Sequence, residues 1–95
     1  KESNMPRPRI CKLIRFSPKV FYFKPQGIPL RFLEIVNLNL EEMEALRLKN
    51  IEKLSQVQAA ERMKISQPTF QRLLSSAYQK ISDALINGKA IRIEK

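Results

Sequence analysis

Apolar residues recur at the period of an α-helix over residues 54–86, with one short interruption. Ala59, Ala60 and Met63 form one inward face, and apolar side chains return at spacings of three and four from residue 70 onward. The members of this second face are Phe70, Leu73, Leu74, Ala77, Ile81, Ala84 and Leu85. Lys64-Ile65-Ser66 separates the two faces as a turn. The pattern predicts a helix-turn-helix whose second helix covers residues 67–86.

Polar residues at the ends of these segments match helix caps. Ser55 precedes Gln58 at the spacing of a capping box, and Ser66 begins the second helix with Pro68 in its first turn. Asn87-Gly88 is a typical left-handed stop.

The first turn position departs from the usual helix-turn-helix pattern. That position normally holds glycine in a left-handed conformation, and here it holds Lys64. We expect the lysine to cost about 1 kcal/mol relative to glycine.

A shorter helix is predicted from Asn39 to about residue 49 or 50. Asn39 and Glu42 have capping-box spacing, and carboxylates in the first turn suit the helix dipole. We expect this helix to bury Leu40, Met43, Leu46 and either Leu48 or Ile51. Its acidic cluster, Glu41, Glu42 and Glu44, is interpreted as capping and solvation rather than as a catalytic carboxylate pair.

Strand-like segments lie near both ends of the chain. Ile10–Phe16 and Val20–Phe23 are rich in β-branched and aromatic residues, and residues 90–93 alternate small or apolar with charged ones. We expect residues 90–93 to pair with Ile10–Phe16, or with a strand swapped from a second subunit, because an isolated strand leaves its backbone unsatisfied. Residues 29–37 are interpreted as a linker or a short turn of helix.

These elements predict a mainly α fold, a three-helix helix-turn-helix domain of winged-helix-like character. The predicted divisions are a leftover at 1–4 before a natural start at Met5, a basic proline-rich arm with short strands at 5–37, the helix-turn-helix domain at 38–88 and a C-terminal strand or tail at 89–95. A chain of 95 residues, 43% of them hydrophobic, is sufficient for one folded domain.

Positive charge is concentrated in the N-terminal third. The net charge is +9, and residues 1–33 hold eight lysines and arginines against one glutamate. A basic domain favours a polyanion partner, usually nucleic acid, although such a surplus also serves solubility alone.

Several kinds of chemistry are not expected. The chain has no histidine and one cysteine, Cys11, which argues against an internal disulfide, a zinc site or a cofactor. No nucleophile is paired with a base, so we do not expect an enzyme. No stretch approaches the roughly 18 apolar residues of a membrane span, and we expect a reduced, cytoplasmic and nucleoid-associated location. Cys11 as a redox or metal sensor across a dimer is a further alternative.

The polar face of the second helix matches the chemistry of major-groove recognition. Glutamine bonds adenine in a bidentate manner, arginine bonds guanine, and threonine offers a hydroxyl and a methyl group. The predicted base contacts are Gln67, Thr69, Gln71 and Arg72, and the predicted phosphate contacts are Lys64, Ser75, Ser76, Gln79 and Lys80. The alternative is a face that is polar because water touches it.

The N-terminal arm supplies a second candidate contact. Pro6 and Pro8 hold Arg7 and Arg9 extended, so that these cations and Lys12 are able to reach the minor groove or track phosphates. The alternative is a solvated tail.

Ordered blocks along the chain resemble a small prokaryotic family, domain-of-unknown-function family one hundred and thirty-four, whose members are predicted DNA-binding proteins. The blocks are MPRPR at Met5–Arg9, YFKP with G-x-P-L at Tyr22–Leu30, EALRL at Glu44–Leu48, LSQ-x-x-AAERM at Leu54–Met63, S-x-x-TFQR at Ser66–Arg72 and NGKA at Asn87–Ala90. The resemblance implies a helix-turn-helix similar to sigma factor region four, in a bacterial or archaeal transcriptional regulator.

Similarity to sigma factor region four places base-reading positions at Gln67, Thr69, Gln71 and Arg72, with Ser76 and Lys80 further along. The sequence departs from the sigma pattern at Gln67 and Ser76, where basic residues are usual, and at Pro68, which replaces an acidic residue. These departures argue against a sigma-type promoter element as the target.

The leading hypothesis is therefore a regulator that binds double-stranded DNA sequence-specifically, as a homodimer, because one helix in one groove rarely supplies enough contacts. The alternative hypothesis is an interaction adaptor that binds RNA polymerase or another regulator through the same helices.

Overall fold

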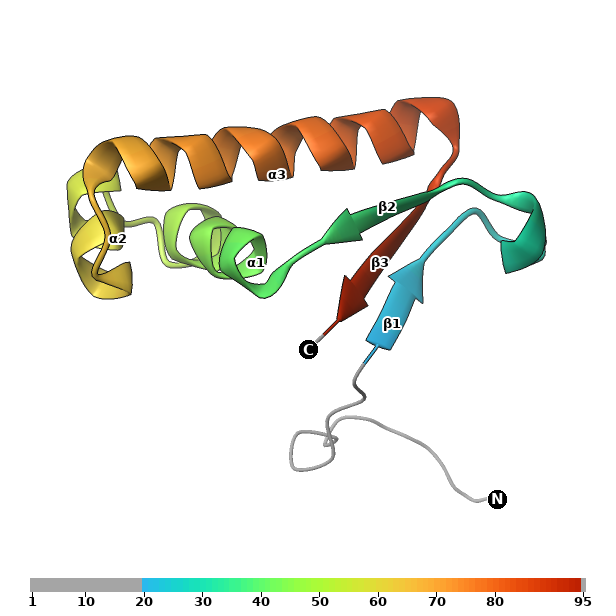
Figure 1. The fold of residues 1–95 in the computed structure, drawn as a ribbon, viewed down its shortest axis with the longest axis horizontal. Coiled ribbons are helices and arrows are strands. Elements are labelled where there is room, and N and C mark those ends of the chain that lie inside the picture. Colours follow the sequence, from blue (N-terminus) through green and yellow to red (C-terminus); the bar gives the residue numbers. More distant parts are fainter. Residues whose placement is uncertain (1–19, 95) are drawn as a thin grey trace, which may run out of the picture.

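The computed structural model describes residues 20–94, and this part of the chain contains three α-helices and one three-stranded sheet (Figure 1). In chain order the elements are β1 (Val20–Phe23), β2 (Ile35–Leu38), α1 (Leu40–Leu46), α2 (Gln56–Met63), α3 (Gln67–Asn87) and β3 (Ala90–Glu94). A 3-10 turn at Leu30–Phe32 precedes β2, and a π-helical turn at Arg47–Ile51 extends α1. The predicted mainly α fold with short strands is confirmed.

The caps read from the sequence begin and end the helices as predicted. The Ser55 hydroxyl accepts from the Gln58 N–H, and the Gln58 side chain accepts from the Ser55 N–H, both at 3.1 Å. At the far end of α3, Gly88 has φ 67° and the Lys89 N–H donates to the Ala84 carbonyl at 2.9 Å. These bonds satisfy backbone groups that helix ends otherwise leave free.

The sheet has the order β1-β3-β2, with β3 in the centre. β3 runs antiparallel to β1, with Phe23 opposite Ile91, and parallel to β2, with Leu38 opposite Ile93. The predicted strand at residues 90–93 is confirmed, but its predicted partner is wrong. Residues 10–16 lie outside the described part of the chain, and β1 and β2 already occupy both edges of residues 91–93.

β2 was not predicted as a strand. It contains only four residues, and Ile35, which points away from the helices, is itself apolar and exposed. A strand with apolar residues on both sides shows no alternation, so its period is hidden in the sequence.

α3 holds the two parts of the fold together (Figure 1). Its first half packs against α1 and α2 in a core of Ala45, Leu48, Ala59, Ala60, Phe70 and Leu74. Its second half packs on the sheet, where Ala77 meets Leu38 and Ile93. The long helix therefore connects the helix-turn-helix to the sheet.

Two residues expected in the core lie at the surface. Leu40 is 52% exposed and Leu85 is 75% exposed, whereas Leu48 is completely buried as anticipated. Leu40 is the first residue of α1 and Leu85 lies in the last turn of α3. Both have the correct helical period, but no neighbouring element in residues 20–94 reaches far enough to cover them.

Candidate nucleic-acid interface

One side of α3 faces solvent along its whole first half. Arg72, Ser75 and Gln79 are exposed and follow one another at spacings of three and four, which places them on one line of the helix. Gln67 and Gln71 are also exposed. The buried residues Phe70, Leu74 and Ala77 lie on the opposite side. The exposed side of α3 formed by Gln67, Gln71, Arg72, Ser75 and Gln79 is the candidate interface and is named the solvent-facing line.

Arg72 is the most versatile donor on this surface. Its guanidinium forms no hydrogen bond or ion pair with another residue in the range 20–94. The adjacent Gln71 makes one long side-chain hydrogen bond, from its amide nitrogen to the Ser75 hydroxyl at 3.4 Å. The polar groups of Arg72 and Gln71 are therefore able to bind an incoming ligand without breaking strong internal bonds.

Thr69 is placed differently from the other predicted base contacts. Its side chain is half-buried, and its hydroxyl accepts from the Ser66 hydroxyl at 2.9 Å. It lines a groove beside Leu40, Met63 and Leu73, on the side of α3 that faces α1. This placement argues against a base contact by Thr69. The other predicted base contacts, Gln67, Gln71 and Arg72, are exposed.

Ser76 and Lys80, predicted as phosphate contacts, instead bind a buried carboxylate. Glu42 on α1 is 2% exposed, and its carboxylate accepts from the Ser76 hydroxyl at 2.5 Å and from Lys80 Nζ at 2.9 Å. The same side chain completes the α1 cap, since it accepts from the Asn39 N–H at 3.0 Å. The predicted capping role of Glu42 is therefore confirmed, whereas its predicted solvation is wrong. Ser76 and Lys80 join α3 to α1.

The Glu42 carboxyl is held in its charged form. Burial by itself raises its pKa, but the hydrogen bonds from Ser76, the Asn39 backbone and Lys80, together with the charge of Lys80, lower the pKa below its ordinary value. A charged Glu42 keeps Lys80 turned toward α1. The remaining predicted phosphate contacts are Lys64, Ser75 and Gln79.

The turn between α2 and α3 has the strained geometry that the sequence predicted. Lys64 has φ 61° and ψ 42°, in the left-handed region, and is exposed. The next residue closes the turn, with the Ile65 N–H donating to the Ala60 carbonyl at 3.0 Å. This arrangement places a cation at the junction of the two helices, close in the chain to the start of the candidate interface.

Replacing Lys64 with glycine is expected to raise the free energy of unfolding by about 0.5–1 kcal/mol, because glycine adopts positive φ without a Cβ clash. Greater freedom of the unfolded chain offsets part of the gain. Urea denaturation measures the change. Lys64→Ala is the matched control, since it removes the charge and keeps the Cβ; a glycine variant no more stable than this control would show that the turn is not strained.

The part of the chain that the structure describes has neither a cluster of metal ligands nor a membrane-spanning helix. Among residues 20–94, no group of three histidine, cysteine or acidic side chains is placed to hold a metal ion. Within the same range, no helix has the length and apolar character needed to cross a membrane. The predicted arm contacts Arg7, Arg9 and Lys12, and Cys11, lie outside the described residues.

Comparison with known proteins gives a consistent set of relatives. A family model described as "Protein of unknown function DUF134" matches residues 3–95. A UPF0251 protein of Thermoanaerobacter pseudethanolicus is 54% identical, and one of Caldanaerobacter subterraneus is 58% identical; each alignment covers 95% of this chain and 76% of the relative. A UPF0251 protein of Dehalococcoides mccartyi is 60% identical, with 95% and 77% covered. No solved structure matches the chain.

Proposed function

The chain belongs to the DUF134 family of proteins of unknown function, and we propose that it is a transcriptional regulator that binds double-stranded DNA sequence-specifically. The observation that carries the proposal is the solvent-facing line of α3. An arginine and two glutamines lie within six residues at the start of a helix that follows a short, capped helix and a tight turn. A helix presented in this way is the recognition element of helix-turn-helix proteins.

The side chains of this line suit base edges in the major groove. Arg72 offers paired donors to guanine O6 and N7, and Gln67 and Gln71 each offer a donor and an acceptor that match adenine. All three are exposed. We assign these three residues to base readout.

Phosphate binding is assigned to a separate set of residues. Ser75 and Gln79 continue the exposed line of α3, and Lys64 stands at the turn. The arm adds Arg7, Arg9 and Lys12, in a segment where residues 1–19 hold six lysines and arginines against one glutamate. Contacts of this kind supply affinity and orientation rather than sequence preference. A nucleoid-associated, cytoplasmic location is part of this proposal.

A protein-interaction adaptor is the second candidate, and one observation favours it. An apolar groove of about 470 Å³ runs along the outer side of α1 and the π-helical turn, lined by Leu40, Met43, Leu46 and Ile51 among others. Such a groove suits apolar side chains of a protein partner. RNA polymerase or another regulator is the partner class for this reading.

A fluorescence-anisotropy titration with mixed-sequence duplex DNA at low and high salt separates the two candidates. If DNA is the ligand, the protein binds at low salt, and the logarithm of the association constant falls linearly with the logarithm of salt concentration by about 0.9 for each phosphate contact. Single-stranded DNA of the same length is the control ligand. Absence of binding to either duplex or single strand at low salt would reject DNA as the partner and favour the adaptor.

A further inference from the structure

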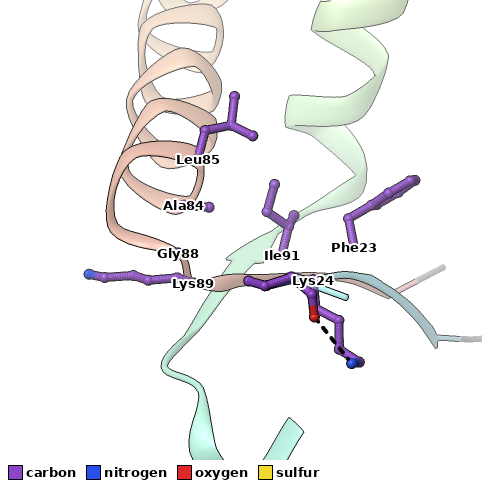
Figure 2. A pocket seen from close by; sticks show the side chains of 8 residues that line it. Phe23, Lys24, Ala84, Leu85, Gly88, Lys89 and Ile91 are labelled. Carbon is purple, nitrogen blue, oxygen red and sulfur yellow. Dashed lines mark hydrogen bonds between the residues drawn. The ribbon is translucent and has the colours of Figure 1, made fainter. Parts of the chain in front are cut away.

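An apolar groove lies at the end of α3 that is remote from the candidate interface (Figure 2). It has a volume of about 320 Å³ and lies between the last turn of α3 and the sheet. Phe23 on β1 and Ile91 on β3 are register partners and project from the sheet, and Leu85 stands above them on α3 (Figure 2). Side chains from three elements therefore form one apolar surface.

This surface is exposed although it belongs to the inner side of the sheet. α3 packs over β2 and β3, whereas β1 packs on β3 and makes few contacts with any helix. Phe23 is consequently 61% exposed, and Leu85 beside it is 75% exposed. Large apolar side chains gathered at one place on a small protein indicate a contact surface.

We propose that this surface, formed by Phe23, Leu85 and Ile91, is the interface at which two copies of the chain form a two-fold symmetric dimer. A two-fold interface uses the same patch on both subunits, so a patch that contains both a hollow and a projecting side chain is able to complement itself. Here the groove and the projecting Leu85 lie side by side. Leu85 of each copy enters the groove of the other.

The charges around the groove also suit a second copy. Lys24 and Lys89 lie at its rim, and Lys89 Nζ is 2.9 Å from Asp83 and 3.2 Å from Glu34. A rim with both signs of charge is able to pair with its own copy, whereas a rim of one sign repels it. This mixture favours self-association over a partner of uniform charge.

The length of α3 relates this interface to the proposed function, on which this step rests. A helix rises 1.5 Å per residue, so Arg72 lies about 20 Å from Leu85 along α3. Two copies meeting near Leu85, with their α3 helices roughly end to end, place their Arg72 residues about 40 Å apart. This separation is close to the roughly 34–36 Å between half-sites one turn apart on duplex DNA.

Sedimentation velocity of the full chain, without DNA, tests the interface. The wild type is expected to sediment as a dimer at micromolar concentration, and Leu85→Glu as a monomer, because each interface would bury two unpaired carboxylates. The dimer dissociation constant should rise by at least about 30-fold. Val57→Glu is the matched control, since Val57 is 50% exposed on α2, away from this surface, and it should remain dimeric.

The possible outcomes separate this proposal from the DNA-binding one. A monomeric wild type would overturn it and would be expected if residues 1–19 of the same chain cover the groove. A Leu85→Glu variant that stays dimeric would also overturn it. A wild-type dimer that Leu85→Glu dissociates, in a protein without DNA affinity, supports the interface and rejects the proposed function. Circular dichroism melting checks that both glutamate variants remain folded.

Discussion

Replacing Glu42 with alanine is expected to lower the free energy of unfolding by about 3 kcal/mol, because the change removes several hydrogen bonds to a buried charge at once. Glu42 accepts from Ser76, Lys80 and the Asn39 backbone, and so joins the cap of α1 to the middle of α3. A loss of this size is a large part of the 5–15 kcal/mol that stabilises typical domains. Urea denaturation followed by circular dichroism measures it.

Glu41→Ala is the matched control for this prediction. Glu41 is the adjacent residue, also in the first turn of α1, but it is exposed. Its replacement should change the free energy of unfolding by no more than about 0.5 kcal/mol. Equal effects of the two substitutions would show that the bonds from Glu42 to α3 contribute nothing beyond charge near the helix start.

The same carboxylate makes stability depend on acid. The Glu42 pKa is lowered in the folded protein, so its contribution is fully present above the ordinary pKa of 4.5 and is lost as pH falls through the folded value. Glu44 and Asp83 also have lowered pKa values, through hydrogen bonds from Arg47 and Lys89. The comparison of wild type with Glu42→Gln isolates the Glu42 contribution: the difference in stability should be largest near neutral pH and shrink below pH 4.5.

Replacing Arg72 with alanine is expected to weaken binding to a preferred duplex by about 10- to 100-fold, which corresponds to the roughly 1–3 kcal/mol of discrimination from one bidentate arginine–guanine contact. Binding to mixed-sequence duplex should weaken much less, because phosphate contacts dominate there. Anisotropy titrations with the two duplexes measure the ratio. The loss of sequence preference is expected at one base pair of the site only.

Arg31→Ala is the matched control for Arg72→Ala, with the same change of net charge. Arg31 lies in the 3-10 turn before β2, which is remote from the start of α3 (Figure 1), and its guanidinium lies 4.7 Å from the Phe32 ring centre. It should leave the ratio between the preferred and the mixed duplex unchanged. If both variants lose affinity for both duplexes equally, the effect of Arg72 is one of net charge alone.

The helices and their ends were predictable because their signals are local. Ser55, Ser66 and Gly88 act on backbone groups within a few residues, and the left-handed conformation of Lys64 follows from its place in the turn. The period of three and four residues then assigned the buried side of α3, with Phe70, Leu74, Ala77 and Ala84 completely or almost completely buried. Local interactions of this kind leave their pattern in the sequence.

The remaining features depend on contacts between distant segments. Ser76 and Lys80 look like solvent-facing residues in the sequence, and only the packing of α1 across α3 brings Glu42 to them, more than thirty positions away in the chain. β2 is recognisable as a strand only from its pairing with β3. Leu85 has the period of a core residue, but its burial depends on elements outside α3, and none within residues 20–94 covers it. For the candidate site, the sequence therefore indicated the helix and its exposed face, whereas the internal hydrogen bonds of Thr69, Ser76 and Lys80 are visible only in the structure.

Selection of bound sequences from random duplex DNA, carried out in parallel with the wild type and Arg72→Ala, is the decisive measurement of whether α3 reads DNA sequence. The wild type is expected to enrich a defined motif, and Arg72→Ala the same motif with one guanine preference lost, because Arg72 contacts a single base pair in the proposed complex. An identical motif from both proteins, or no enrichment by the wild type, would contradict the claim that the solvent-facing line of α3 reads DNA sequence.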